Sequence, residues 1–307
     1  MRAPRAVVFA YHDVGVRCLK TLLSGGVEVP LVVTVADDPN ENRWFASVAD
    51  TARDYGLPVI TPEEANTPRL LGQVADCAPD FLFSFYYRSM LGEPLLECAR
   101  RGALNIHGSL LPNYRGRAPV NWAILNGERE TGATLHYMVA RADAGDIVDQ
   151  LAVPILADDD AREVYAKVTA AAEIILARSL AALLTGTAPR LAQRIEPGQY
   201  FGRRRPEDGR IDWRWPATRI HNLVRAVAPP FPGAFTEATG RRLWIHRTRV
   251  EAMRGVQGLP RLFAEQGVCY AVCGEGVLRI LAMADENGSV NLTRAAREWQ
   301  SQSIPLV

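Results

Sequence analysis

Short runs of strand-forming residues alternate with helix-like segments through the first half of the chain. The runs start about 20 to 30 residues apart, a spacing typical of right-handed βαβ units. They read AVVFAY, VPLVVTV, PVIT, FLFSF and ALNIH, at residues 6–11, 29–35, 58–61, 81–85 and 103–107. This rhythm predicts an α/β domain with a Rossmann-like, mostly parallel sheet that has helices on both faces.

Two further runs and a long helix complete this predicted domain. Residues 133–139 and 147–155 flank the segment ARADAGD, so they predict a pair of strands joined by a functional loop. Residues 158–186 begin with acids, carry apolar residues at helical spacing and end at a glycine, which predicts a long helix. We expect this helix to close a catalytic domain spanning residues 1–188.

The composition changes after this helix. Residues 189–209 are rich in Pro, Gly, Gln and Arg, which predicts a linker between domains. A helix-like segment and three strand-like runs follow, at residues 216–227, 241–250, 267–272 and 276–283. We therefore predict a small C-terminal open β-barrel domain, OB-like, over residues 210–307.

Charge and cysteine content exclude several functional classes. A formal net charge of +1 argues against nucleic acid as a partner. We expect that no apolar run reaches membrane-spanning length, and the N-terminus lacks a signal-peptide cleavage pattern, so we expect a cytoplasmic protein without membrane insertion. The five cysteines lack the paired spacing of zinc sites, so we expect neither disulfides nor a metal.

Polar side chains cluster where the run at 103–107 ends. Asn105, His107 and Ser109 occupy alternate positions, so a strand would place them on one face. That end of the strand is where α/β sheets usually bind ligands. No G-x-G-x-x-G follows the first run, which argues against a nicotinamide dinucleotide, and no G-x-S-x-G surrounds Ser109, which argues against a serine hydrolase.

Asn105, His107 and Asp143 together suit acyl transfer. A carboxylate beside an imidazole fixes its tautomer and stabilises its protonated form. A neutral amide beside that imidazole can stabilise a developing oxyanion. The trio therefore predicts transfer of an acyl group to a nucleophile that the substrate supplies.

The segments LNIHGSLLPNYRGRAPVNWAILNG and TGATLHYMVARADAGDIV resemble the folate-dependent formyltransferases. The hallmark of that family is an Asn-x-His pair, an SLLP segment and a distant Asp in a D-x-G loop. The similarity covers nearly the whole chain and includes RIDWRWPA, LVRAV and PPFPGAF near the start of the predicted C-terminal domain. It implies a Rossmann-like catalytic domain, an open-barrel domain and 10-formyltetrahydrofolate as co-substrate.

The resemblance also implies roles for individual residues. Asn105 and His107 would bind the oxyanion, and His107, supported by Asp143, would move a proton between the attacking amine and the departing folate nitrogen. The implied folate contacts are Tyr87, Arg88, Met90, Arg117, Val139, Ala140, Arg141, Ala142 and Asp143.

Other residues suit the binding of a sugar nucleotide, one class of substrate in this family. Arg203, Arg204 and Arg205 suit a diphosphate clamp, with a solvated basic linker as the alternative. Tyr11 and His12 are expected to end the first strand and to face the crevice beyond the carboxyl ends of the strands. For His12, capping of the next helix is the alternative. For Arg117, the alternative to a folate contact is a surface ion pair.

Members of this family differ in the amine that they formylate. Enzymes acting on methionyl-tRNA carry a basic insertion after the second strand, whereas this chain has Asp37, Asp38 and Glu41 against the single Arg43 there. The segments VVFAYHDVG, FSFYYR, RADAGDIV and FGRRRPED are similar to enzymes that formylate UDP-4-amino-4-deoxy-L-arabinose for lipid A modification and polymyxin resistance. We therefore predict this UDP-linked amino sugar as the acceptor.

Several alternatives stay open. Methionyl-tRNA or another nucleotide sugar could be the acceptor, and a non-catalytic protein could use this fold to bind folate or a nucleotide. The intact trio argues against pure binding, which needs no proton-transferring groups. The similar sugar-nucleotide enzymes are best known as fusions to a dehydrogenase/decarboxylase, so the chain is either a stand-alone transferase or one portion of a longer protein. A homo-oligomer is compatible with the sequence.

Overall fold

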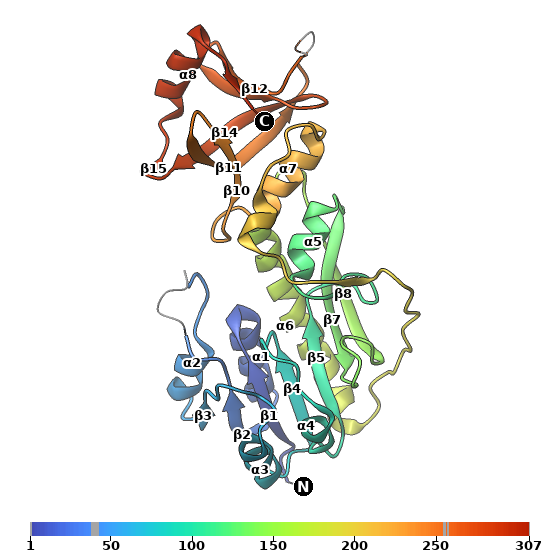
Figure 1. Cartoon of the computed structure of the whole chain (residues 1–307). Coiled ribbons are helices and arrows are strands. Elements are labelled where there is room, and N and C mark those ends of the chain that lie inside the picture. Colours follow the sequence, from blue (N-terminus) through green and yellow to red (C-terminus); the bar gives the residue numbers. More distant parts are fainter. Residues whose placement is uncertain (1, 38–42, 254–255, 257, 307) are drawn as a thin grey trace. The chain divides into compact units, whose positions relative to one another are not determined.

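The chain folds into two compact units (Figure 1). The computed structural model describes residues 2–37, 43–253, 256 and 258–306. Unit 1 comprises Met1–Pro119, Thr131–Val153 and Ala166–Gly202, and unit 2 comprises Val120–Glu130, Pro154–Tyr165 and Arg203–Val307. Two internal segments therefore group with the C-terminal residues and not with their neighbours in the sequence.

A seven-stranded sheet forms the centre of unit 1. Its strands run in the order β3-β2-β1-β4-β5-β7-β8, and the pairs from β3 to β5 are parallel while β5 and β7 are antiparallel. The strands are β1 (Arg5–Ala10), β2 (Glu28–Val33), β3 (Val59–Ile60), β4 (Phe81–Phe85), β5 (Ala103–His107), β7 (Glu130–Tyr137) and β8 (Ile147–Pro154). The predicted mostly parallel α/β sheet is confirmed.

Both faces of this sheet are buried, as a parallel sheet requires. On one face, Val7 and Phe9 of β1 pack with Leu70 and Val74 of α3. The alternate residues of β1, Ala6 to Ala10, are also fully buried. The helices of this part of the chain are α1 (His12–Ser24), α2 (Val48–Asp54), α3 (Pro68–Asp76), α4 (Glu93–Glu97) and α6 (Ala161–Thr185).

Helix α6 is long and apolar enough, by length and composition alone, to cross a membrane. The expectation that no apolar run reaches this length was therefore wrong. Val168 and Ile175 on one face of α6 are fully buried in the protein. Its Glu173 pairs with Arg17 and its Arg178 pairs with Asp149. Burial of one face and ion pairs on other faces are typical of a core helix.

Unit 2 is a nearly closed antiparallel barrel with helices against it, which confirms the predicted C-terminal barrel. Its strands run in the order β10-β11-β14-β13-β12-β16, and β15 pairs with β14. They are β10 (Ala234–Ala238), β11 (Arg241–Glu251), β12 (Arg261–Glu265), β13 (Val268–Val272), β14 (Val277–Asp285), β15 (Gly288–Ser289) and β16 (Ile304–Pro305). The helices are α5 (Pro119–Leu125), a 3₁₀ turn at Pro206–Gly209, α7 (Ala217–Ala226) and α8 (Leu292–Ser301).

Two buried side chains of α7 attach the segment Pro154–Tyr165 to unit 2. Arg225 donates from Nη1 to the carbonyls of Leu156 and Asp159 at 3.2 and 3.1 Å. His221 donates from Nε2 to the carbonyl of Ala157 at 2.9 Å. Three backbone carbonyls of the segment are thus paired with donors on α7, which explains why this segment groups with α7.

The chain that follows α6 stays attached to unit 1. Leu191 and Ile147, the first residue of β8, exchange two backbone hydrogen bonds of 2.8 and 2.9 Å. Further along, β9 (Tyr200–Phe201) pairs with β6 (Arg115–Gly116) in a two-stranded parallel sheet. We call residues 190–202 the strap. They lie within the stretch that the sequence predicts as a linker.

Candidate active site

Asn105, His107 and Asp143 come together where β5 ends. Asn105 and His107 lie on β5, and Asp143 lies in the loop that joins β7 to β8. The Nδ1 atom of His107 is 3.6 Å from Oδ1 of Asp143. Asn105 joins this pair through a fourth side chain, His136 of β7, whose Nε2 atom is 3.7 Å from the same Asp143 oxygen. The structure thus brings the predicted trio into one cluster.

His136 is a site residue that the sequence analysis missed. The antiparallel register of β5 and β7 places it directly opposite Asn105. In the sequence it is only a polar residue inside an apolar run, and its role depends on a strand pairing that periodicity does not specify. The one sequence signal for His136 was its place within the strand-like run at 133–139, the next such run after the one that carries Asn105 and His107.

The hydrogen bonds of His136 fix the orientation of the Asn105 amide. Nδ1 of His136 lies 2.8 Å from the carbonyl of Tyr137, which can only accept, so Nδ1 carries the proton. Nε2 therefore accepts from Nδ2 of Asn105 at 3.1 Å. Burial lowers the pKa of His136 to about 4, although Asp143 and the Tyr137 carbonyl oppose this shift. A neutral His136 thus holds one N–H of Asn105 and leaves the other available.

His107 is held by oxygen atoms at both ends of its ring. Its Nε2 donates to the carbonyl of Tyr114 at 2.8 Å. Its Nδ1 faces Asp143 at 3.6 Å, which is too long for a direct hydrogen bond. The ring is almost fully buried, so the hydrogen bond to Tyr114 and the surrounding packing set its orientation.

Asp143 is an ionised carboxylate in a largely buried position. Burial opposes its ionisation, but His107, His136, the Gly116 N–H and Arg115 outweigh that effect and hold the pKa of Asp143 below its usual value. The Gly116 N–H donates to Oδ2 at 2.9 Å. Oδ1 is left facing the two histidine rings.

The backbone of the Asp143 loop is also fixed. The buried Arg115 donates from Nη2 and Nε to the carbonyl of Ala142 at 2.9 and 3.2 Å. A Cβ at Gly145 would collide with the carbonyl oxygen of Tyr137, so the glycine of D-x-G is required by close backbone approach. Arg115 of β6 and the loop's own Gly145 thus hold the backbone that carries the acid.

Ser109 stabilises the turn after β5. Its fully buried hydroxyl donates to the carbonyl of Asn113 at 2.6 Å, and its own carbonyl accepts from Thr134 at 2.6 Å. Thr134 also accepts from the backbone N–H of Leu111. Ser109 therefore helps shape the SLLP segment, in agreement with the argument against a serine hydrolase.

Several loops of unit 1 contain non-glycine residues with positive φ. Tyr86 follows β4 with φ of 58°, Tyr114 precedes β6 with φ of 56°, and Asp143 has φ of 51°. Such conformations are unfavourable for residues with a Cβ and concentrate at functional sites. Two of the strained residues therefore belong to the cluster: Asp143 itself, and Tyr114, whose carbonyl accepts from His107.

His12 also has a positive φ, of 66°, but it does not end the first strand as expected. β1 ends at Ala10, and His12 is the first residue of α1. It provides no side-chain cap, because Tyr11 is the N-cap residue and makes no capping hydrogen bond. Its ring instead packs against Phe45 and Trp44, with ring centres 4.3 and 4.6 Å away.

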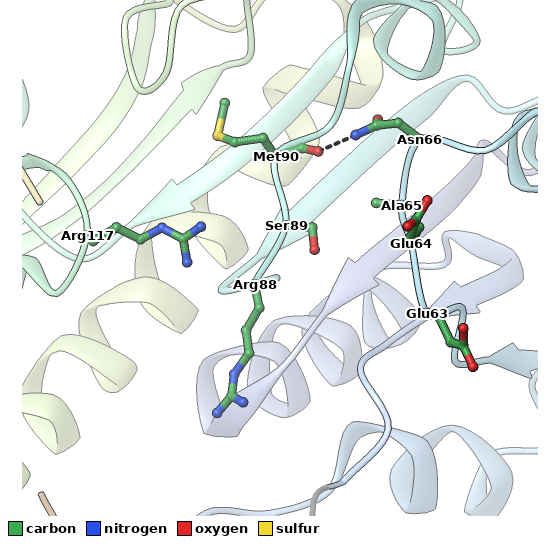
Figure 2. A pocket seen from close by; sticks show the side chains of 8 residues that line it. All are labelled: Glu63, Glu64, Ala65, Asn66, Arg88, Ser89, Met90 and Arg117. Carbon is green, nitrogen blue, oxygen red and sulfur yellow. Dashed lines mark hydrogen bonds between the residues drawn. The ribbon is translucent and has the colours of Figure 1, made fainter. Parts of the chain in front are cut away.

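A cavity of about 450 Å³ opens beside the loops that follow β3, β4 and β6. Figure 2 shows the guanidinium groups of Arg88 and Arg117 on one side and the carboxylates of Glu63 and Glu64 on the other. The remaining lining residues are Ala65, Asn66, Ser89 and Met90. The structure thus brings together Arg88, Met90 and Arg117, three of the predicted folate contacts.

The other predicted folate contacts do not line this cavity. Tyr87 packs edge-on against Phe9, 5.3 Å away, at the rim of the hydrophobic core. Val139, Ala140 and Arg141 are exposed in the loop that carries Asp143. Tyr11, predicted instead to contact the sugar nucleotide, is buried beneath the guanidinium of Arg88, which lies 4.4 Å from its ring centre.

The three consecutive arginines after the strap belong to unit 2 and differ in environment. Arg203 and Arg205 are exposed. Arg204 is partly buried, lies 4.9 Å from the ring centre of Trp122 and donates to the carbonyl of Asp208 at 2.9 Å. Arg203 and Arg205 are thus the better placed of the three to meet a ligand from solvent.

Of the three acidic residues predicted to distinguish the segment after β2, only Asp37 is among the described residues. Asp37 accepts from Arg43 and, at 3.1 Å, from the hydroxyl of Ser47. Asp38 and Glu41 lie outside the described residues. Within the described part of the chain, no three His, Cys, Asp or Glu side chains are arranged to hold a metal ion.

The sheet, its polar carboxyl edge and the amide–imidazole–carboxylate cluster define a group-transfer enzyme of the α/β class. The chain belongs to the formyl transferase family: the family profile "Formyl transferase" matches residues 6–180 and the profile "Formyl transferase, C-terminal domain" matches residues 204–294.

Solved structures similar to this chain share its fold at low sequence identity. An N-formyltransferase from Helicobacter canadensis, in complex with folinic acid and dTDP-3-aminofucose, is 20% identical with a TM-score of 0.69, over 94% of this chain and 100% of that chain. A 4-N formyltransferase from Francisella tularensis is 20% identical with a TM-score of 0.64, over 81% and 99%. HypX from Aquifex aeolicus, in complex with tetrahydrofolic acid, is 18% identical with a TM-score of 0.65, over 98% and 48%.

The lowered pKa of His136 predicts a loss of stability in acid. Folded His136 resists protonation until about pH 4, whereas the unfolded side chain titrates near 6.5. The free energy of unfolding should therefore fall as the pH drops from 6.5 to 4, by about 3 kcal/mol from this residue. Urea unfolding followed by tryptophan fluorescence across this range measures the change.

The matched variant for this prediction is His136→Gln, which can still accept from Asn105 but does not titrate. Its free energy of unfolding should fall less steeply between pH 6.5 and 4. His221 and His246, whose pKa values burial also lowers, contribute equally to both proteins and cancel in the difference. Parallel curves for the two proteins would contradict the prediction.

Proposed function

We propose that this enzyme transfers a formyl group from 10-formyltetrahydrofolate to the amino group of a nucleotide sugar, with UDP-4-amino-4-deoxy-L-arabinose as the acceptor. The observation that carries the formyl-transfer proposal is the cluster of Asn105, His107, His136 and Asp143. Support for the ligands comes from the similar structures, which include proteins in complex with folinic acid, tetrahydrofolic acid and dTDP-3-aminofucose.

Each side chain of the cluster has a distinct role in this reaction. The bound folate supplies the formyl group; a bond forms between the acceptor nitrogen and the formyl carbon, and the bond from that carbon to the folate nitrogen breaks. Asn105, oriented by His136, directs its second N–H at the developing oxyanion. His107, with the Asp143 carboxylate beside it, accepts at Nδ1 the proton that the amine loses and returns it to the departing nitrogen.

The chemistry of the cavity in Figure 2 fits folate. Folate has carboxylates at one end and a pterin ring rich in N–H donors at the other. Arg88 and Arg117 suit the carboxylates, and Glu63 and Glu64 suit the donors. A volume of about 450 Å³ lies within the usual range for small-molecule sites. Arg117 follows Gly116, whose N–H holds Asp143, so this cavity and the catalytic cluster share one loop.

Two features favour a compact sugar nucleotide over a tRNA. The described part of the loop after β2 contains a single basic residue, Arg43, and it is paired with Asp37. The exposed Arg203 and Arg205 offer two cations, which suits a diphosphate better than a long phosphate backbone. Arg204 instead stabilises the 3₁₀ turn through Asp208.

Replacement of the catalytic residues tests the mechanism. Asn105→Ala, His107→Ala and Asp143→Ala should each lower kcat about a hundredfold or more, because oxyanion stabilisation and positioned proton transfer are lost. Double variants should lose far less than the product of the single losses, since the groups act together. Tetrahydrofolate release measures turnover. Asp146→Asn, in the same loop, is the control, and activity of His107→Ala near that of the control would exclude its proposed role.

The acceptor is tested by comparing amines in one assay. We expect tetrahydrofolate release with UDP-4-amino-4-deoxy-L-arabinose, less with dTDP-linked amino sugars, and none above the His107→Ala background with methionyl-tRNA. The sugar reaction should depend only weakly on salt, because few phosphates are engaged. A preference for methionyl-tRNA would overturn the sugar assignment. Folate binding without release from any acceptor would instead indicate a binding protein.

The diphosphate clamp is tested by removing the two exposed arginines. The double variant Arg203→Ala with Arg205→Ala should raise KM for the sugar nucleotide about tenfold and change kcat less than threefold, because uniform binding is lost. Arg297→Ala, on the surface of α8, should leave both constants unchanged. Arg204→Ala should instead lower Tm. A KM unaffected by the double variant would show that the diphosphate binds elsewhere.

A further inference from the structure

The strap passes both loops that build the catalytic cluster. At one end, Leu191 pairs with Ile147 at the start of β8. At the other end, the carbonyls of Gln199 and Phe201 accept from the N–H groups of Arg115 and Arg117 at 2.9 Å each. The ring of Phe201 also stacks on Tyr114, whose carbonyl holds His107, with ring centres 4.8 Å apart.

Gln193 of the strap binds the backbone on both sides of Ala144. Its amide Nε2 donates to the carbonyl of Asp143 at 3.0 Å and to the carbonyl of Gly145 at 2.6 Å. Both protons of the amide are thus used on one turn of the loop. The side-chain oxygen of Gln193 is buried and has no hydrogen-bond partner among the described residues. An unpaired buried acceptor is unfavourable, so the two hydrogen bonds that the amide donates to the Asp143 loop must offset this effect.

These contacts determine where the Asp143 side chain points. Arg115 fixes the peptide before Asp143 through the Ala142 carbonyl, and Gln193 fixes the peptide after it. With both flanking peptides held, the residue keeps its positive φ and its Oδ1 stays 3.6 and 3.7 Å from His107 and His136. Small displacements of a catalytic group can have large effects on rate.

We infer that Gln193 is a positioning residue for formyl transfer, which acts by holding the Asp143 loop so that its carboxylate faces both histidines. This inference rests on the proposed role of Asp143 in proton transfer. Gln193 acts on the placement of one carboxylate. Its replacement should therefore change kcat and the titration of Asp143 and should leave substrate binding unchanged.

The principal variant is Gln193→Met, which keeps the length of the side chain and removes its N–H donors. We expect kcat to fall about tenfold, with KM for folate and for the amine within twofold of wild type. In the Asp143→Asn background the same change should cost less than twofold, because the carboxylate that Gln193 positions is absent. Glu196→Ala, an exposed side chain on the same strap, is the control and should stay within twofold throughout.

A second readout needs no substrate. Carbon-detected NMR of labelled aspartate should show the pKa of Asp143 moving up toward its usual value in Gln193→Met, since the two histidines no longer lie close to it. If Gln193→Met does not fold by circular dichroism, Gln193→His, which can donate to one of the two carbonyls, is measured in the same way. A failure of the proposed function would appear as an inactive wild-type protein, independent of this titration.

Two results would overturn the inference. One is a Gln193 variant whose kcat and Asp143 titration both match the wild type. The other is a loss of kcat that is equally large in the Asp143→Asn background, since Gln193 would then act on something other than the carboxylate.

Discussion

An ionised carboxylate in a largely buried position needs donors and positive groups around it, and Asp143 imposes this requirement on unit 1. The Gly116 N–H donates to Oδ2, His107 lies 3.6 Å from Oδ1, and the guanidinium of Arg115 adds positive charge. These partners come from segments that lie far from Asp143 in the sequence. Much of the local architecture, including the strained backbone at Asp143, follows from the need to hold those partners in place.

The pairing of β5 with β7 is the second element on which the site depends. Because the two strands are antiparallel and in this register, Asn105 faces His136 and His107 faces Thr134. One pair orients the Asn105 amide, and the other brings Thr134 to the turn that contains Ser109. A shift of one residue would turn both pairs away from each other. The sheet therefore sets the geometry of the Asn105, His107, His136 and Asp143 cluster as well as the framework around it.

Periodicity and local motifs predicted the central sheet and three residues of the candidate site. The βαβ rhythm predicted the sheet, and the alternate spacing of Asn105 and His107 with a distant Asp143 predicted residues that the structure brings together. His136 could not be predicted, because strand register is not visible in one sequence. The strap looked like a linker because its composition has no period and Gln193 bonds to partners 50 and 48 residues away. Arg204 differs from its neighbours for a similar reason, since its contact with Trp122 spans distant segments.

The position of the strap changes where this chain can be divided. A fragment cut where the composition changes, near residue 188, would keep every strand of the large sheet and the whole of α6. It would lose the carbonyls that hold Arg115 and Arg117 and the amide that holds the Asp143 loop. The strap, although its composition is the least regular, therefore belongs with unit 1. Recombination between relatives would conserve the site only if the crossover fell after Gly202.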